Sequence, residues 1–286
     1  MTKDISTLKR DIYHVLQTGE GYTEEIEQWV ADDFKRALHD QFNGRGERKR
    51  TLRVSSLGTE CERKLWYSTR GEYQPEPIPA STYNKFIFGN LTESHLLGLV
   101  KASGHHLCGL QDKVDVHGIK GSRDCVIDGM LFDIKSASSS SFKKFARGQL
   151  RYSDPFGYIS QISSYLYGSQ SDPLVTYKTK AGFLVMDKQY GDITVDVYDL
   201  TEELEKKQEE VEGKKAIAKS DTPPPRPYKP KEDGKSGNMA LPFECGWCEW
   251  KKACWPTLRT FMNANGDTRR LVEVVREPGG SYMETT

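Results

Sequence analysis

Apolar residues recur at the spacing of an α-helix in the first forty residues of the chain and in several later segments. Ile5, Leu8, Ile12 and Val15 would share one face of a helix, because residues three and four apart lie on the same side. The first forty residues carry no chemical pattern, so we expect their helices to serve in packing or docking. The same spacing predicts helices over 4–42 with a break at 19–21, and over 61–67, 81–102, 157–167 and 201–219.

The apolar pattern changes from helical to alternating between residues 111 and 136. Val114 and Val116 alternate with polar residues, and Asp128-Gly129 then forms a turn dipeptide between two apolar runs. We therefore predict a β-hairpin that closes at this dipeptide, followed by strands over 182–186 and 193–198. Helices before and after these strands favour an α/β fold with a mixed central sheet flanked by helices.

The predicted hairpin brings acidic residues together on one face. With a two-residue loop, Asp124 lies directly opposite Asp133 at a Cβ separation of about 5 Å. Lys135 projects from the same face, while Cys125 and Phe132 point to the other face, which we expect to be the buried one. Two carboxylates beside an amine suit a divalent cation with oxygen ligands. The alternative is a solvent-exposed hairpin with an ordinary Asp–Lys ion pair. The arrangement also depends on the assumed loop length, because a three-residue loop would separate the two aspartates.

The cysteines divide into a cluster and scattered residues. Cys245, Cys248 and Cys254 fall within ten residues, a spacing that favours a metal or a metal cluster whose fourth ligand comes from elsewhere in the chain. Thiolates suit both zinc and iron–sulfur centres. We assign Cys108 and Cys125 to the core, since neither has a partner in this pattern.

Charge restricts how the protein could bind an anionic partner. The 286 residues include 41 Lys plus Arg and 41 Asp plus Glu, and a net charge of zero excludes a uniformly basic surface. Local patches remain as candidates, each with a plain solvated face as the alternative. The two candidate patches are the stretch 45–53 and the group Lys143, Lys144, Arg147 and Arg151.

The sequence predicts neither a membrane span nor a secretory signal. No apolar run approaches the roughly 20 residues of a membrane span, and no secretory signal is visible. We therefore expect a cytoplasmic protein without a membrane partner.

Motifs on both sides of the hairpin occur in a consistent order. Gly89-Asn-Leu-Thr-Glu93 lies upstream, Gly121-Ser-Arg-Asp124 and Asp133-Ile-Lys135 form the hairpin, and Gln161-Ile-Ser-Ser-Tyr165 lies downstream. Together they resemble the PD-(D/E)XK nuclease superfamily in its RecB-like branch. The resemblance implies a restriction-endonuclease-like α/β core with a mixed central sheet.

The resemblance also implies a role for each motif residue. Lys135 would orient the attacking water and stabilise the transition state. Gln161 and Tyr165, four residues apart on one helical face, would position the phosphate backbone. The metal, Mg²⁺ or Mn²⁺, would be held by Glu93, Asp124, Asp133 and the carbonyl of Ile134.

A second resemblance concerns the cysteines. Cys61-Glu-Arg-Lys-Leu-Trp-Tyr67 is similar to the cysteine-arginine-tyrosine segment of iron–sulfur RecB-family nucleases, in which one N-terminal and three C-terminal cysteines bind a [4Fe–4S] cluster. That group includes AddB-type helicase–nucleases, exonucleases of CRISPR adaptation, and phage-encoded relatives. The resemblance covers residues 52–256. It implies a cluster on Cys61, Cys245, Cys248 and Cys254 that staples a helical part of the protein, with zinc as the alternative metal.

We thus expect an N-terminal helical segment over 1–50, a nuclease domain over 51–256 that includes a proline-rich connector at 221–242, and a C-terminal tail over 257–286. The expected activity is metal-dependent exonucleolytic hydrolysis of phosphodiester bonds in DNA at single-stranded ends. The resemblance places it in recombination, repair or processing in a bacterial or phage-infected cell. The DNA path would be lined by Lys143, Lys144, Arg147 and Arg151.

Two other functions remain open at this point. One is a nuclease or assembly factor of CRISPR adaptation, with proteins of recombination or CRISPR adaptation as partners. The other is an iron–sulfur or zinc DNA-binding protein without hydrolytic activity. The complete Asp124, Asp133 and Lys135 set favours an active enzyme.

Overall fold

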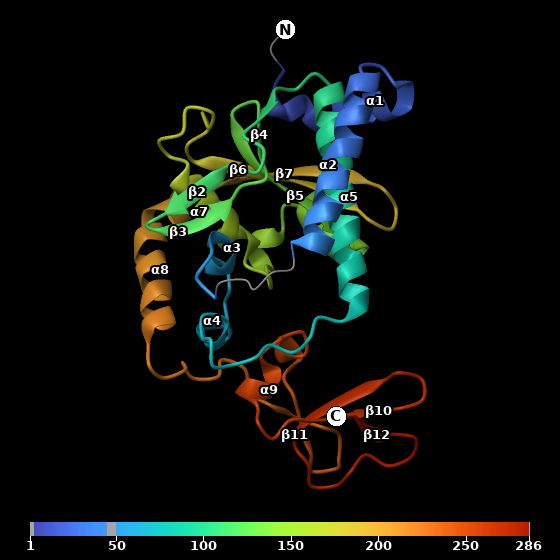
Figure 1. Cartoon of the computed structure of the whole chain (residues 1–286), viewed down its shortest axis with the longest axis vertical. Coiled ribbons are helices and arrows are strands. Elements are labelled where there is room, and N and C mark those ends of the chain that lie inside the picture. The colour runs from blue at the N-terminus through green and yellow to red at the C-terminus, as the bar shows by residue number, and fades with distance from the viewer. Residues whose placement is uncertain (1–2, 45–49, 286) are drawn as a thin grey trace. The chain divides into compact units, whose positions relative to one another are not determined.

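The computed structural model describes residues 3–44 and 50–285 (Figure 1). The chain divides into two compact units, each made of two segments. Unit one comprises residues 1–60 and 80–215, and unit two comprises 61–79 and 216–286. The basic stretch predicted at 45–53 falls largely outside the described residues.

Unit one is built on a mixed sheet with the strand order β1-β4-β5-β6-β7. Among the described pairings of this sheet, β5 with β6 is the parallel one, and the chain passes between these strands through α6 and α7, because parallel neighbours need a crossover connection. The elements are η1 Ile5–Thr7, α1 Leu8–Thr18, α2 Glu24–Asn43, α3 Val54–Leu57, α5 Ala80–Ala102, β1 Leu107–Cys108, β2 Lys113–Val116, β3 Ile119–Ser122, β4 Cys125–Ile127, β5 Met130–Ala137, α6 Ser139–Ala146, η2 Leu150–Tyr152, α7 Tyr158–Gly168, β6 Lys180–Asp187, β7 Ile193–Asp199 and α8 Thr201–Lys219, whose last residues belong to unit two.

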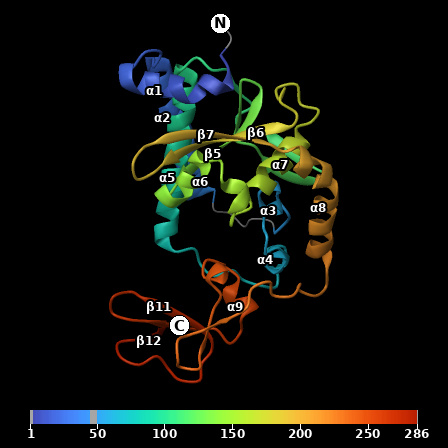
Figure 2. The ribbon, with the colours of Figure 1, turned by 180° about the vertical axis from the view of Figure 1, so that it is seen from behind.

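Helices cover both faces of this sheet (Figures 1 and 2). On one face, apolar residues of α1 and α5 form a core with Phe132 and Ile134 of β5. On the other face, α3, α6 and α7 and the small β2–β3 hairpin form a second core with Leu131 and Phe183. The prediction of an α/β fold with a mixed sheet flanked by helices is therefore confirmed.

The hairpin forms with the predicted register, but its burial differs from the prediction. Cys125 pairs with Phe132 and Ile127 with Met130, and Asp128 and Gly129 turn the chain with positive φ angles of 47° and 82°. The expectation that only one face is buried was wrong, since Leu131 on the acidic face is also buried. The crossover between β5 and β6 explains this, because it places helices over the face that carries the acids.

The strongly periodic segments match their predictions closely. The helices expected over 81–102, 157–167 and 201–219 are α5, α7 and α8, and the short helix expected at 61–67 is α4. Helix α6 was not predicted, because its eight residues contain only Phe142 and Phe145 as large apolar side chains. The strands after residue 257 were also not predicted, since their apolar positions are too few to show alternation.

Unit two combines two short helices with a second sheet. That sheet has the strand order β12-β10-β11-β9-β8, and its described pairings are antiparallel. Aromatic residues Trp66, Tyr67 and Trp250 form a small core. The elements are α4 Glu62–Ser68, β8 Lys231–Glu232, β9 Met239–Ala240, η3 Phe243–Cys245, α9 Lys251–Cys254, β10 Arg259–Met262, β11 Thr268–Glu273 and β12 Met283–Thr285.

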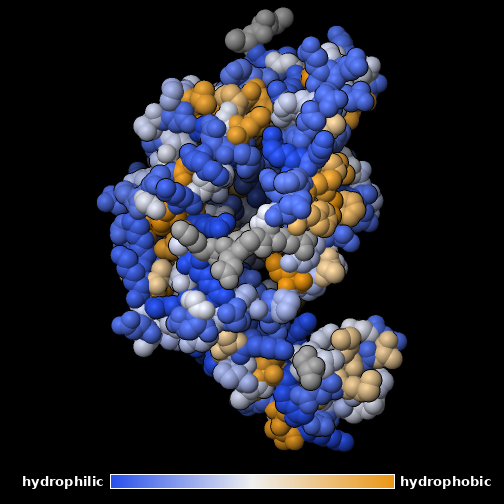
Figure 3. Space-filling model, viewed as in Figure 1, coloured by the Kyte–Doolittle hydropathy of each residue, from blue (hydrophilic) through white to orange (hydrophobic). Residues whose placement is uncertain are grey.

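The surface is largely hydrophilic on the face drawn in Figure 3, with separate apolar patches. Phe86, Phe88 and Leu91 of α5 are among the exposed apolar side chains of unit one. Within residues 3–44 and 50–285, no helix is long and apolar enough to cross a membrane.

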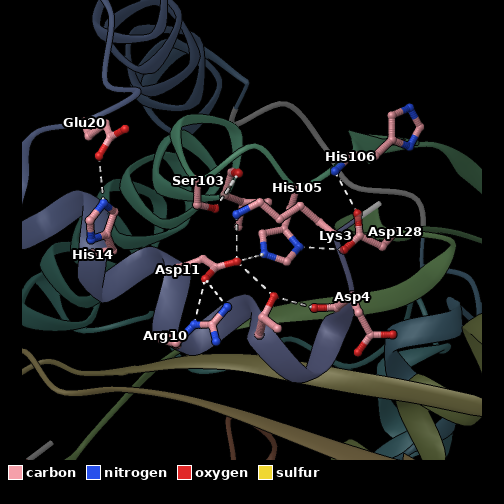
Figure 4. Close-up of polar contacts among 12 residues, drawn as sticks. Lys3, Asp4, Arg10, Asp11, His14, Glu20, Ser103, His105, His106 and Asp128 are labelled. Atoms are coloured by element: carbon pink, nitrogen blue, oxygen red, sulfur yellow. Dashed lines mark hydrogen bonds and ion pairs between the residues drawn. The ribbon is translucent and has the colours of Figure 1, made fainter. Parts of the chain in front are cut away.

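A buried histidine joins the N-terminal helix to the hairpin turn (Figure 4). The His105 side chain is fully buried, with Nδ1 2.6 Å from Asp128 Oδ2 and Nε2 3.3 Å from Asp11 Oδ2 of α1. Burial by itself would raise the pKa of Asp11, but hydrogen bonds, the strongest from Lys3, hold it well below its usual range. The Asp128 carboxylate also accepts the backbone N–H of His106 at 2.8 Å. This network therefore connects α1, the segment after α5 and the β4–β5 turn.

We predict that His105→Ala lowers the free energy of unfolding by about 3 kcal/mol, because it removes a fully buried imidazole that contacts the carboxylates of both Asp11 and Asp128. The surface pair of His14 and Glu20, joined at 2.9 Å, offers the matched control. His14→Ala should cost less than about 1 kcal/mol, since both partners are exposed. Urea unfolding of the three proteins measures the difference, and equal losses in the two variants would contradict the assignment.

Candidate functional site

The hairpin positions two carboxylates at the start of β4 and in the middle of β5. Asp133 lies in β5 and is 5% exposed. Asp124 immediately precedes β4, and its Oδ2 accepts the backbone N–H of Ile134 at 2.9 Å. The two-residue turn produces this arrangement, because it fixes the pairing of the two strands up to Cys125, the residue next to Asp124. The structure thus brings together the two aspartates predicted from the register.

Helix α5 contributes a third carboxylate. Glu93 Oε1 accepts a hydrogen bond of 2.8 Å from Gln111 Nε2. Its pKa is raised, chiefly by burial and further by the negative charges of Asp33 and Asp133. Asp33 belongs to α2, where its Oδ2 accepts a 2.6 Å hydrogen bond from the Ser94 hydroxyl. Glu93 therefore belongs to the same electrostatic cluster as the hairpin acids.

Lys135 is the cation of this cluster. Its Nζ lies 2.5 Å from Asp133 Oδ2. On the other side, Nζ lies 4.8 Å from the ring centroid of Tyr158 in a cation–π contact. Burial alone would lower the pKa of Lys135, but the carboxylates of Asp133 and Asp124 raise it above its usual value. The amine is consequently held as a fixed positive charge between an acid and an aromatic ring.

Helix α7 places the predicted Gln161 and Tyr165 beside these groups. Tyr165 is buried, and burial raises the pKa of its hydroxyl. A hydrogen bond from Gln161 opposes this shift, whereas the nearby charges of Asp124 and Asp133 reinforce it. Tyr165 therefore lies within electrostatic range of the acidic cluster, and Gln161 is hydrogen-bonded to Tyr165.

Lys135 does not fully offset the repulsion among the acids. The pKa of Asp124 is well above its usual value, first because of burial and then because Asp133 and Glu93 repel its charge. Within the described ranges, no group of three or more His, Cys, Asp or Glu side chains is arranged to hold a metal ion. Mg²⁺, however, is commonly held by one or two carboxylates, with waters and substrate phosphates completing its shell. The pair Asp124 and Asp133 fits that requirement, and a cation there would turn repulsion into attraction.

The basic residues predicted to line a DNA path divide into two kinds. Lys144 Nζ donates to the carbonyl and hydroxyl oxygens of Ser153, at 3.2 and 2.7 Å. Arg151 pairs with Glu203 of α8. Lys143 and Arg147 are exposed on and just after α6. Lys144 and Arg151 thus hold the loop before α7, while Lys143 and Arg147 present their charges to solvent.

The predicted cysteine quartet lies within unit two. Cys61 caps the N-terminus of α4, where its Sγ accepts the Lys64 N–H at 3.4 Å. The Tyr67 hydroxyl of the same helix donates to the carbonyl of Ala253 at 3.1 Å. Cys254 ends α9, and its carbonyl accepts a hydrogen bond from Arg226. Helix α4 is therefore fastened to the segment that carries the C-terminal cysteines.

The charges of three of these thiols act on the fourth, Cys245, despite their distance in sequence. Burial raises the pKa of Cys245 to about 11, and the thiols of Cys254, Cys248 and Cys61 each add to this shift. The aromatic core that includes Trp250 packs against Cys248 and Cys254. Thiolates suit soft metal centres, but in the described part of the chain these cysteines, like the other Cys, His, Asp and Glu residues, form no group of three or more arranged to hold a metal ion. Cys125 is buried in the core of unit one, as predicted.

Three residues near the acids were not predicted from the sequence. Tyr158 precedes Gln161 by three positions and shares its helical face, a signal that could have been used. Asp33 lies on a helix assigned only to packing, and Gln111 lies in the connection before the β2–β3 hairpin. Neither gives a local pattern, because their places depend on how distant elements pack.

Comparisons with known proteins give little further guidance. A scan against models of protein families finds no match, and no curated protein matches the chain. A solved structure described as the crystal structure of SSO0001 shares 13% sequence identity, with a TM-score of 0.38, and the match covers 81% of this chain and 96% of that chain. A likeness of this degree carries no conclusion about function.

We predict that Asp124→Asn raises the melting temperature of metal-free unit one at pH 8 by about 3 °C, corresponding to about 1 kcal/mol for a domain of this size. The amide removes one repelling charge but keeps an oxygen for the Ile134 N–H. Differential scanning calorimetry of the whole chain in a chelator measures the shift. Asp192→Asn, which changes an exposed acid between β6 and β7, is the control and should leave the temperature unchanged.

The same raised pKa predicts how stability depends on pH. A native carboxyl that keeps its proton longer than the unfolded chain stabilises at low pH, so metal-free stability should fall as pH rises from about 4 through the raised pKa of Asp124. Asp124→Asn should flatten this decline, and added Mn²⁺ should restore stability to the wild-type protein. An unchanged pH slope in the variant would refute the repulsion.

Proposed function

We propose that this protein is a metal-dependent nuclease with a PD-(D/E)XK-type core that hydrolyses phosphodiester bonds at single-stranded DNA ends. The proposal rests chiefly on one juxtaposition, in which Asp124, Asp133 and Lys135 meet on the β4–β5 hairpin. Glu93 from α5 and the Gln161–Tyr165 pair from α7 join them. These residues come from three separate parts of the chain, and the three parts follow one another along the sequence in the order that the resemblance implies.

Each side chain has a role that follows from its charge and its surroundings. Asp124 and Asp133, with Glu93 and the carbonyl of Ile134, would hold Mg²⁺ or Mn²⁺. Such an ion, when bound, supplies a hydroxide nucleophile at neutral pH and neutralises charge on the phosphate. Asp124 is already oriented by the Ile134 N–H, so it needs little rearrangement.

Lys135 has the charge and position to stabilise a phosphorane-like transition state. Its amine is held between Asp133 and the Tyr158 ring and keeps its proton at neutral pH. A fixed ammonium stabilises the negative charge that develops on phosphate oxygens, without any reorganisation during the reaction. Gln161 and Tyr165 would hold the adjoining phosphate through their amide and hydroxyl groups.

Unit two would carry a [4Fe–4S] cluster on Cys61, Cys245, Cys248 and Cys254, with zinc as the alternative. The electrostatic influence of the other three thiols on Cys245, and the aromatic core against which Cys248 and Cys254 pack, support this assignment. A metal centre of this kind would cross-link α4 to a segment more than 180 residues away in sequence, and such links stabilise by restricting the unfolded chain.

We predict that Asp133→Ala abolishes Mn²⁺-dependent degradation of an end-labelled single-stranded oligonucleotide, because it removes a carboxylate that would hold the metal.

Lys135→Ala should lower kcat by about 10²–10³-fold, the usual effect of removing one group that stabilises transition-state charge. Since the amine is not a metal ligand, calorimetric titration should give Lys135→Ala nearly the Mn²⁺ affinity of the wild type. Gel analysis of the product ladder measures the rates.

Asp192→Ala serves as the matched control and should cut the strand at the wild-type rate, because its carboxylate is exposed at the β6–β7 turn. Wild-type cleavage by Asp133→Ala would exclude the hairpin as the catalytic site. DNA binding without cleavage by the wild-type protein would favour the non-hydrolytic alternative.

For unit two, anaerobically purified protein should be brown and contain about four irons per chain. Cys61→Ser should bleach the colour and reduce the soluble yield, because it breaks the link between α4 and the C-terminal cysteines. Cys108→Ser and Cys125→Ser should keep the colour. One zinc and no iron would assign the quartet to zinc, and full colour in Cys61→Ser would show that residue 61 is no ligand.

A further inference from the structure

A series of aromatic rings leads from the surface of unit one to the amine of Lys135. Phe156 precedes α7. The centroid of its ring lies 5.5 Å from the centroid of the Tyr158 ring, and the two ring planes meet at an angle of 30°. Tyr158 in turn holds Lys135 Nζ at 4.8 Å. The Phe156 side chain is 65% exposed, although a buried phenylalanine would contribute far more to stability. One flat ring is thus presented to solvent a single ring away from the proposed catalytic lysine.

The segment that carries Phe156 is held firmly by contacts on both sides. Asp154 Oδ2 accepts the backbone N–H of Ile159 at 2.8 Å. Lys144 of α6 fixes Ser153 through two hydrogen bonds. Gly157 has a positive φ of 69°, and a Cβ at this position would collide with the carbonyl of Gly58. The exposed ring is therefore presented by an ordered segment.

Positive charge lies on the neighbouring helix. Phe145 of α6 contacts the Tyr158 ring at a centroid distance of 6.1 Å. The same helix carries Lys143, and Arg147 follows it directly, both exposed. Exposed aromatic rings and basic side chains together are the groups that bind single-stranded nucleic acid, in which bases stack on rings while phosphates pair with basic groups.

We propose that Phe156 stacks a base of single-stranded DNA next to the scissile phosphate, and that this contact makes the site prefer unpaired ends. The inference rests on the proposed nuclease function and adds a recognition residue to it. A base within a duplex already has neighbours on both faces, so only an unpaired or splayed base can place its face on this ring. Stacking of this kind accepts any base, which suits an enzyme that degrades strands of arbitrary sequence.

The test compares intact strands with strands that lack a single base. In an Asp133→Asn background, which keeps the DNA uncut, fluorescence anisotropy measures binding of a labelled oligothymidylate and of a series with one abasic site moved along it. Phe156→Ala should weaken binding of the intact strand about tenfold. For the Asp133→Asn protein with Phe156 intact, an abasic site at one position of the strand should weaken binding by the same factor. With the abasic site at that position, adding Phe156→Ala should weaken binding no further.

Two variants control for general effects. Phe156→Trp should restore binding, because a larger ring still stacks. Tyr190→Ala removes a ring that is 70% exposed at the β6–β7 turn and should bind as the parent does. An equal loss in Phe156→Ala at every abasic position, or a loss as large in Tyr190→Ala, would overturn the stacking proposal.

Cleavage separates this inference from the function on which it rests. Strand cutting by the wild-type chain, with DNA affinity unaffected by Phe156→Ala, would refute stacking and leave the nuclease intact. Base-dependent binding at Phe156 without any cutting in Mn²⁺ would support stacking and refute the nuclease.

Discussion

The two-residue turn at Asp128 and Gly129 is the constraint on which the rest of unit one depends. Its positive φ angles set the pairing of β4 with β5, and that register decides which side chains stand beside one another. The Asp128 carboxylate also holds His105 and the backbone of His106. One short turn thereby fixes both the position of the acids and the attachment of α1 through Asp11.

The acids around Asp124 repel one another, whereas the carboxylates at the turn have favourable partners. Around His105, each carboxylate has a cationic or hydrogen-bonding partner. Around Asp124, the charges of Asp133 and Glu93 raise its pKa, and the opposing effects of Lys135 and the Ile134 N–H do not offset them. Groups left in such a state within a well-packed core are characteristic of functional sites, because stability alone would favour their neutralisation. The proposed metal would supply the missing positive charge.

Much of this arrangement could be predicted from the sequence, and the exceptions have physical causes. The hairpin, its register and the helices α5 and α7 follow from local periodicity and from a turn dipeptide, so Asp124, Asp133 and Lys135 could be placed beforehand. Burial of both sheet faces could not be foreseen, since it depends on the crossover between β5 and β6. Asp33 and Gln111 likewise reach the acids only through tertiary packing.

The close approach of Gly58 and Gly157 limits how this chain can change over evolution. A Cβ on either residue would meet the carbonyl of the other, so neither glycine can be replaced unless the two backbones separate. Such a separation would move the first turn of α7, which bears both Tyr158 and Gln161. Divergent lineages that retain this chemistry should therefore keep both glycines, even where the surrounding sequence has drifted beyond recognition.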